Sequence, residues 1–578
     1  MYFVLNKLKS QLKQSWLVDI LAILIVFALF YAIGIGSHAL FTPDEGRYSE
    51  VAREMVASGD YITPRLNGVA FLDKPALYYW LQASAIHLFG LKDWALRFWP
   101  ATLGIFGALV TYIVGRRLYN RRAGILAAIM LATSPLYYGA AHYANLDLEV
   151  AVLISTSLLC FIAAMQSVTS LSKNGFLYTA YFFAGLAVLT KGLIGIAFPA
   201  LIIGAWIAMT GRWRTLLHMR VLSGLCLFAL IVVPWYYLVQ QANPEFLHFF
   251  FVTQQVSRFL TTQDFNDKAP VWFYVPVVLL GLMPWSIFLF QALSKKIRAI
   301  WQAKSQHAVD LYLLIWFFVV FVFFSIPRSK TVGYILPLFP VGALLIGSYL
   351  SQIWDKAEAK KAGWVFIIMS SVIAGGLFIT PMFAVKLEIP RALLPFLQGM
   401  GGCFLLAAVL SLFCFRQKNV LPFFSVMVVT ISAALLIFMT SAGVINEKST
   451  KPLALMLKPM LAPTDEVVVY YKYYQDLPIY LERRVTVVAD WHSPDIQKRD
   501  NWLREMWYGM VFQDTKDWLI EDDTFWQRWH SNKRLYVITD QGYYEHLSQK
   551  ARVYKLAQFH DAFLLSNQSS FIERPNTY

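Results

Sequence analysis

The residues from Leu17 to Ile35, LVDILAILIVFALFYAIGI, form an almost unbroken apolar run with one charged side chain, Asp19. A helix that crosses a membrane needs about 20 such residues, whereas the apolar core of a signal peptide is shorter. Three lysines, Lys7, Lys9 and Lys13, precede the run. We therefore predict an uncleaved first membrane span that follows a cytoplasmic N-terminus.

Comparable apolar runs recur as far as Val444, and the chain as a whole is 58% hydrophobic and only 15% charged. This composition predicts an α-helical polytopic membrane protein. We predict about thirteen spans, near residues 16–36, 95–116, 123–141, 148–168, 175–190, 193–210, 221–240, 271–293, 308–326, 333–352, 363–383, 396–414 and 421–444.

The basic residues agree with this division, because they gather in short clusters between the apolar runs. With thirteen spans, all the clusters fall on one side of the membrane, which the positive-inside rule makes cytoplasmic. The clusters lie at residues 7–13, 116–122, 212–220, 295–298, 356–361 and 416–418. The net charge of +15 thus reflects topology, and we predict no nucleic-acid partner.

This topology requires that the apolar segment Pro75–Phe89 does not cross the membrane. At about 15 residues it is short for a span, and we predict an interfacial helix. The first external loop, residues 37–94, and the tail, residues 447–578, then lie outside. Strand-like stretches at Glu466–Tyr474 and Arg534–Thr539 predict that the tail is an α/β domain following a membrane domain of residues 1–446.

The cations on the external side run against the charge bias and need another explanation. Any one of them can place its charge among lipid headgroups. As a set, they suit an anionic ligand such as a lipid phosphate, and Tyr334 can donate a hydrogen bond to the same anion. The set is Arg47, Lys74, Lys191, Arg258, Arg328 and Lys330.

External carboxylates are the second group of candidates. Thr42 and Glu45 have the spacing of a capping box, with Pro43 at the first helical position, so Glu45 has a sufficient structural role. Asp44 is less completely explained. Its side chain can face the membrane surface together with Arg47 and Tyr48, and we predict a functional role for it.

Asp147 lies in a short external turn between two predicted spans. The structural alternative to a functional role is that Asp147 caps the next helix. Asp73 has the same alternative, because a helix follows through Pro75, and Lys74 is then the stronger candidate of that pair. The sequence has no HExxH, CxxC, P-loop or GxSxG pattern, so neither a metal site nor a nucleotide-dependent mechanism is predicted.

Several of these residues stand in motifs that resemble the bacterial lipid A aminoarabinose transferases, members of the GT-C superfamily that also includes protein O-mannosyltransferases. The matching motifs are Thr42-Pro-Asp-Glu-Gly-Arg-Tyr48, Ala52-Arg-Glu-Met55, Ser58-Gly-Asp60, Asp73-Lys-Pro75, Tyr78-Tyr-Trp80, Leu146-Asp147, Thr190-Lys-Gly192, Arg258-Phe259, Trp272 to Pro276, Pro284-Trp285 and Tyr334-Ile-Leu336. The resemblance is ordered along the membrane region and is weak in the tail.

The resemblance implies a GT-C fold in a bacterial inner membrane, with the tail in the periplasm. It implies an undecaprenyl-phosphate-linked sugar donor, lipid A as the acceptor and, in consequence, polymyxin resistance. It assigns essential acidic positions to Asp44 and Asp147, and contacts with the carrier phosphate to Lys74, Arg258 and Tyr334. Glu45 joins the acidic candidates, and Arg47, Tyr48, Asp73, Lys191 and Lys330 are expected to support them.

Two positions depart from the family pattern. Asp73 replaces the usual Glu before Lys-Pro, and Gln254-Gln255 stands where a Glu-His pair is expected. These positions are linked to a metal in relatives, so a divalent metal is left open but is not supported by the sequence, and no cofactor is assigned.

The expected reaction is an inverting displacement at the anomeric carbon, with polyprenyl phosphate as the leaving group. Asp44 orients the acceptor or the sugar, and it acts as a general base only if the acceptor is a hydroxyl. Two alternatives remain open. One is a protein O-glycosyltransferase acting on Ser or Thr, and the other is a flippase for lipid-linked sugars, although no internal repeat is evident.

Overall fold

The computed structural model describes residues 15–257, 268–355, 360–414, 420–499, 501–510 and 512–569. The chain forms two compact units, each assembled from separate stretches of sequence. The first unit is helical and comprises residues 1–38, 97–234 and 267–445. The second comprises residues 39–96, 235–266 and 446–578.

Long apolar helices build the first unit. Its main helices are α2 (Trp16–Ala32), α6 (Phe98–Leu118), α7 (Arg121–Ala132), α8 (Pro135–Ala141), α9 (Leu146–Met165), α10 (Ser170–Lys191), α11 (Ile194–Thr210), α12 (Thr215–His218), α13 (Val221–Ala242, which continues into the second unit), α15 (Tyr274–Gly281), α16 (Leu289–Gln302), α17 (Ala308–Ser325), α18 (Phe339–Ile353), α19 (Lys360–Phe383), α20 (Leu394–Cys414) and α21 (Leu421–Ile445). Short 3-10 turns, η2 (Val271–Phe273), η3 (Trp285–Phe288), η4 (Val332–Leu338) and η6 (Arg391–Leu393), join some of them.

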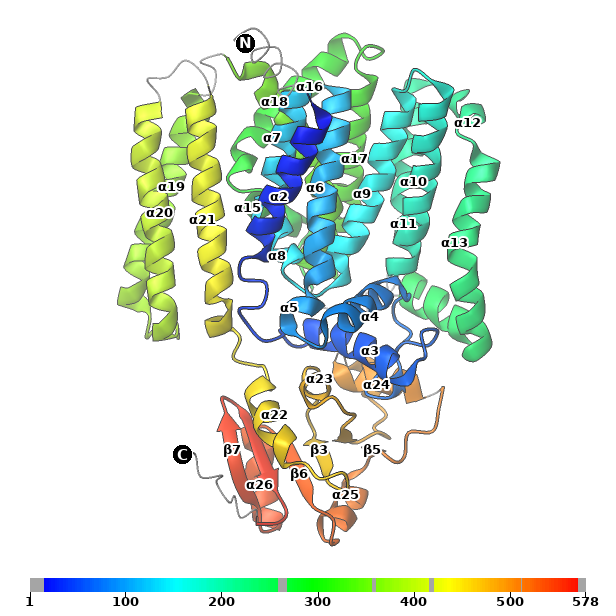
Figure 1. The fold of residues 1–578 in the computed structure, drawn as a ribbon, viewed down its shortest axis with the longest axis vertical. Coiled ribbons are helices and arrows are strands. Elements are labelled where there is room, and N and C mark those ends of the chain that lie inside the picture. The colour runs from blue at the N-terminus through cyan, green and yellow to red at the C-terminus, as the bar shows by residue number, and fades with distance from the viewer. Residues whose placement is uncertain are drawn as a thin grey trace, which may run out of the picture. The chain divides into compact units, whose positions relative to one another are not determined.

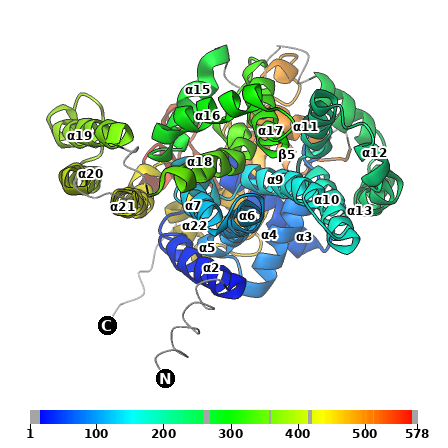
Figure 2. The same cartoon turned by 90° about the horizontal axis from the view of Figure 1, so that it is seen from above.

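Helices α6, α7, α9 and α18 pack together at the centre of this unit, as Figure 2 shows. Small residues allow the close approach, since a Cβ at Gly124 of α7 would lie 2.6 Å from the Tyr112 carbonyl oxygen of α6. Helices α19, α20 and α21 pack against one another at one side of the unit (Figures 1 and 2).

The helices agree with a multi-pass membrane protein. Within the described residues, eight helices are long and apolar enough to cross a membrane, or ten if each of two bent pairs is one span. Every predicted span coincides with a helix or a bent pair, but the count of thirteen stays a prediction, because α2, α10 and α11 are not among those eight.

Two predicted spans are broken rather than straight. The segment predicted at 123–141 bends by 64° between α7 and α8, where Ser134-Pro135 interrupts the helix. The segment predicted at 271–293 bends by 109° between α15 and α16, next to Pro284. A proline has no backbone N–H to donate within a helix, which accounts for the breaks.

The single charge in the opening apolar run is paired within the first unit. Asp19 is 5% exposed and accepts hydrogen bonds from Arg116 at 2.7 Å, Arg121 at 2.6 Å and the Tyr112 hydroxyl at 2.6 Å. A buried carboxylate needs such partners, so the cluster attaches α2 to α6 and α7.

The second unit combines the first external loop with the tail. The loop forms α3 (Asp44–Ser58), the hairpin β1 (Arg65–Leu66) and β2 (Val69–Ala70), α4 (Leu77–Phe89) and α5 (Asp93–Leu96). The irregular helix η1 (His248–Ser257) follows α13. The helix predicted at Pro75–Phe89 is therefore present, and its interfacial position stays a prediction.

The tail is an α/β domain, as predicted. Its helices are α22 (Lys451–Leu457), α23 (Leu477–Leu481), α24 (Trp502–Met510), α25 (Asp522–Trp529) and α26 (Gln541–Lys550), with turns η7 (Lys458–Met460) and η8 (Ile496–Lys498). Its strands are β3 (Glu466–Tyr470), β4 (Thr486–Val488), β5 (Leu519–Ile520), β6 (Leu535–Thr539), β7 (Tyr554–Phe559) and β8 (Ala562–Ser566). They form one sheet in the order β5-β4-β3-β6-β8-β7. Figure 1 labels β7, β6, β3 and β5 of this sheet.

Strands β5, β4, β3 and β6 are parallel, and β8 runs antiparallel between β6 and β7. Helices α25 and α26 pack on one face through Phe525, Trp529 and Leu547. The chain leaves β3 toward β4 but leaves β6 in the opposite direction, so right-handed crossovers place α23 and α24 on the other face. The tail is thus doubly wound, with its switch point between β3 and β6.

Loop and tail interlock within this unit. The Asn67 side chain forms two 2.9 Å hydrogen bonds with the backbone of Val485, and Trp518 donates to the Asn67 carbonyl at 2.9 Å. Gly46 of α3 packs so closely that a Cβ there would lie 2.7 Å from the Asp476 nitrogen. The division into domains 1–446 and 447–578 stays a prediction, and the two compact units have different boundaries.

Candidate active site

The candidate carboxylates of the first loop stand at the start of α3. Glu45 is fully buried, and its Oε2 accepts the backbone N–H of Phe41 at 2.8 Å. The helix starts at Asp44, one residue later than predicted, and Pro43 is the N-cap without a side-chain cap bond. Glu45 therefore reaches back as a capping residue does, but to Phe41, and the predicted Thr42 box is not formed.

Arg47 joins Asp44 to a residue of the tail. Its guanidinium donates to Asp44 Oδ1, which lies one turn away on α3. It also donates to Glu505 Oε1, which belongs to α24. Burial by itself lowers the pKa of Arg47, but the Glu505 and Asp44 carboxylates hold that pKa well above its ordinary value. Arg47 is thus a permanent cation between two carboxylates.

The shift in the pKa of Glu505 favours its neutral form, whereas that of Arg47 favours the charged form. Burial raises the pKa of Glu505 above its ordinary value, and the Asp73 and Asp44 charges add to this, while Arg47 and Lys74 oppose it. These five charged groups therefore lie within mutual electrostatic range. Glu505 was not predicted from the sequence, because a glutamate in an aromatic-rich segment of the tail carries no motif.

The remaining predicted residues of the loop gather at the same place. The Lys74 ammonium donates to the Asp73 carbonyl at 3.1 Å, and the Asp73 charge acts on Arg47. The Arg47 guanidinium lies 5.2 Å from the centre of the Tyr48 ring. The structure thus unites Asp44, Arg47, Tyr48, Asp73 and Lys74 in one group, which we call the loop cluster together with Glu505.

A buried ion group lies on the same helix α3. Arg53 donates to both oxygens of Glu50 at 2.7 and 2.6 Å, and Glu54 accepts the backbone N–H of Gly68 at 2.7 Å. Burial raises the pKa of Glu50 to about 8 and that of Glu54 above its ordinary value. These contacts hold the helix that carries Asp44 against the β1–β2 hairpin.

A second cluster belongs to the first unit and centres on Asp147. The N-cap of α9 is Asn145, whose side chain accepts the Asp147 N–H at 2.9 Å. The alternative that Asp147 itself caps α9 is therefore wrong. Its carboxylate instead pairs with Lys191 at the end of α10, and both side chains are largely buried.

Tyr334 completes this arrangement. The Lys191 ammonium lies 4.2 Å from the centre of the Tyr334 ring, a cation–π distance. Gly333 packs against Asp147 so tightly that an added Cβ would overlap the carboxylate. We call Asp147, Lys191, Gly333 and Tyr334 the helix cluster.

One predicted cation, Lys330, makes its contacts outside the helix cluster. The Lys330 ammonium is buried and donates to the backbone carbonyls of Ala269 at 3.1 Å and of Pro327. Lys330 therefore connects the loop at Ala269 with the loop that contains Pro327 and Lys330 itself. Arg258 lies outside the described residues.

No metal-binding group emerges from the part of the chain that the structure describes: no three His, Cys, Asp or Glu side chains there are arranged to hold a metal ion. Within that region the Asp73 charge acts on Arg47, and the Asp73 carbonyl accepts a hydrogen bond from Lys74.

Comparison with known proteins identifies the class. Residues 16–250 match the family model described as dolichyl-phosphate-mannose-protein mannosyltransferase. The crystal structure of ArnT from Cupriavidus metallidurans bound to undecaprenyl phosphate superposes with a TM-score of 0.83 and 26% sequence identity, covering 96% of this chain and 99% of that one. The fold is that of the GT-C class of membrane glycosyltransferases.

Two curated relatives narrow the assignment of this chain from a class to a family. The undecaprenyl phosphate-α-4-amino-4-deoxy-L-arabinose arabinosyl transferase of Erwinia tasmaniensis is 32% identical over 401 residues, covering 67% of this chain and 70% of the relative. That of Edwardsiella ictaluri is 32% identical over 330 residues, which span 57% of this chain and 59% of the relative. The chain belongs to this arabinosyl transferase family.

Proposed function

We propose that the protein transfers 4-amino-4-deoxy-L-arabinose, or a related amino sugar, from undecaprenyl phosphate to a phosphate of lipid A. The observation that carries the proposal is the near full-length superposition on an ArnT structure bound to undecaprenyl phosphate. The names of the curated relatives supply the sugar. The eight to ten apolar helices among the described residues support a multi-pass membrane location.

The charge pattern supports a site on the external side of the membrane. Arg116, Arg121 and Arg122 lie at the end of the first unit where α6 ends and α7 begins. Asp147 and Lys191 lie at the opposite end, where α9 begins and α10 ends. If the arginines are cytoplasmic, as the positive-inside rule requires, the helix cluster faces the periplasm.

The reaction is a displacement at the anomeric carbon. A phosphate oxygen of lipid A forms the new bond to this carbon, the bond to the carrier oxygen breaks, and undecaprenyl phosphate leaves with the electron pair. The configuration at the anomeric carbon inverts. Because the attacking phosphate is already ionised, no general base is needed.

The two clusters supply different parts of this chemistry. Lys74 and Tyr334, with Arg258, interact with the carrier phosphate and stabilise the charge that grows on it as it leaves. Asp44 is held by Arg47 in one orientation and positions the sugar or the acceptor. Asp147, held by Lys191, is a carboxylate suited to the sugar's ammonium group.

A specific observation also favours a second candidate, transfer to Ser or Thr of exported proteins. The matching family model, over residues 16–250, is that of protein mannosyltransferases. A hydroxyl acceptor needs a base, and Asp44 would have to provide it.

Mass spectrometry of lipid A tests the proposal. A host strain lacking its own transferase, but able to make the donor, carries either this protein, its Asp44→Asn variant or Asp523→Asn, an exposed position on α25. We expect an added mass equal to one amino-sugar residue with the wild type and with Asp523→Asn, and none with Asp44→Asn. Unmodified lipid A at normal expression, with modified exported proteins, would support the second candidate instead.

A further inference from the structure

The doubly wound tail has a cleft at its switch point. It has a volume of about 700 Å³ and is lined by Lys472, Asp540, Gln541, Gly542, Tyr543, His546 and Asp561. Lys472 follows β3, Asp540 follows β6, and Asp561 lies between β7 and β8. In doubly wound sheets, ligands bind outside the carboxyl ends of the strands at this point.

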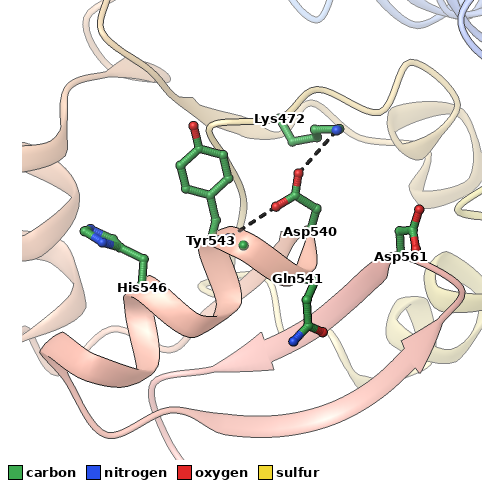
Figure 3. Close-up of a pocket in the computed structure, with 7 residues that line it drawn as sticks. Lys472, Asp540, Gln541, Tyr543, His546 and Asp561 are labelled. Carbon is green, nitrogen blue, oxygen red and sulfur yellow. Dashed lines mark hydrogen bonds and ion pairs between the residues drawn. The ribbon is translucent and has the colours of Figure 1, made fainter.

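The lining of the cleft is held in place by packing and hydrogen bonds. Asp540 caps α26 by accepting the Tyr543 N–H at 3.2 Å, and its other oxygen lies 3.3 Å from the Lys472 ammonium (Figure 3). The Tyr543 ring stacks on Tyr471 with centroids 5.1 Å apart. The side chains of Asp540, Lys472 and Tyr543 are therefore positioned before any ligand arrives.

The chemistry of the lining argues against an anionic ligand. A nucleotide site at such a point needs glycines after the first strand, so that the backbone can approach the phosphates. Here the residues after β3 are Tyr471-Lys-Tyr-Tyr-Gln-Asp476. The Asp540 carboxylate already caps the N-terminus of α26, where a phosphate would bind. Asp540 and Asp561 together outweigh the single charge of Lys472.

An apolar ligand is equally unsuited, because all six lining residues other than Gly542 carry a polar group. Carboxylate, amide, imidazole and phenol groups can bond sugar hydroxyls in both directions. The excess carboxylate suits an ammonium group. We infer that this cleft binds an amino sugar, with the ammonium toward Asp540 and Asp561 and the hydroxyls toward Gln541, Tyr543 and His546.

Such a site goes beyond the transfer reaction, because its residues belong to the tail alone and none of them is in the loop cluster or the helix cluster. Binding requires neither the lipid-linked donor nor lipid A. A failure of the proposed function would therefore leave this inference standing, and the reverse is also true.

Saturation-transfer NMR on the full chain in detergent, without donor or acceptor, tests the inference. The probes are glucosamine, at a pH where its amine is charged, and N-acetylglucosamine, which has no charge. We expect transfer to glucosamine and at least about fivefold weaker binding of N-acetylglucosamine, because a charge-assisted hydrogen bond is lost.

Two variants locate the binding. Asp561→Asn removes one charge from the exposed hairpin and should weaken glucosamine binding about tenfold. Gly542→Leu fills the cleft without changing the charge and should abolish binding. Asp523→Asn, which removes a charge elsewhere in the tail, should bind as the wild type does. Equal binding of the two probes, wild-type binding by Asp561→Asn and Gly542→Leu, or no glucosamine signal at all would each overturn the inference.

Discussion

The loop cluster and the helix cluster both pair an aspartate with a cation, but they are assembled differently. Arg47 is one turn from Asp44, yet its second partner, Glu505, is in the tail. Asp147 and Lys191 come from neighbouring helices of one unit, and Tyr334 contributes only a ring face. The difference teaches that the first cluster depends on the tail, whereas the second depends on helix packing alone.

Removing Arg47 should have the largest effect of the substitutions considered, on both transfer and stability. In Arg47→Ala, the partly buried Asp44 and Glu505 lose their shared cation. We expect more than about 100-fold loss of transfer and about 3–5 kcal/mol lower free energy of unfolding, because two carboxylates of a largely buried ion group are left uncompensated. A transfer assay and thermal unfolding in detergent measure both effects.

Arg499→Ala is the matched control, because Arg499 is exposed in the same unit. It should change unfolding by less than about 1 kcal/mol. If Arg47→Ala unfolded like this control, the tail would have no energetic role in the loop cluster.

Asp147→Asn should show that the two clusters differ in their contribution to stability. We expect about 100-fold slower transfer, because the charge near the reacting sugar is lost. The free energy of unfolding should fall by only about 1–2 kcal/mol, because the asparagine amide keeps a hydrogen-bond acceptor for the Lys191 ammonium and the Tyr334 ring still contacts it. The same two assays apply, and a loss of stability as large as that of Arg47→Ala would refute the contrast.

Gly333→Ala should act through packing. The added methyl would overlap the Asp147 carboxylate and displace it from Lys191, so we expect about tenfold slower transfer. Gly139→Ala is the control, because a Cβ at Gly139 meets nothing within 4 Å. Equal rates for the two variants, measured at matched expression, would show that the position of Asp147 tolerates movement.

The smallest effect concerns pH and the buried Glu50. Its pKa is about 8 in the folded protein against an ordinary 4.5, so the unfolded chain releases this proton first as the pH rises. This contribution therefore lowers stability between pH 4.5 and 8. We expect the wild-type melting temperature to fall by about 5 °C from pH 5 to pH 8, and Glu50→Gln to fall less.

The exposed Glu545→Gln variant on α26 is the control and should follow the wild type. A Glu50→Gln slope as steep as the wild-type slope would mean that Glu50 does not hold its proton in the folded state.

Much of the fold was predictable, because apolar length and charge clusters are local properties of the sequence. The helices, the α/β tail and the grouping of Asp44 with Arg47 and Tyr48 all followed from them. The bends at Ser134-Pro135 and Pro284 were missed, although prolines signal them.

The partners across long separations were not predictable from spacing. Glu505 meets Arg47 only because Gly46 and Asn67 bring the loop against the tail. Asp147 was weighed as a helix cap, but Asn145, two residues earlier, takes that role and leaves the carboxylate for Lys191. Local patterns identify which residues are unusual, whereas tertiary packing decides what they touch.

The pairing of Arg47 with Glu505 also has a consequence for biosynthesis. A ribosome adds about 5–20 residues per second, so helix α3 waits on the order of tens of seconds for its partner after it is made. During that interval the buried carboxylates of α3 have no tail to cover them. A chain that stops before residue 505 can insert its first helices into the membrane, but it lacks the partner that completes the loop cluster.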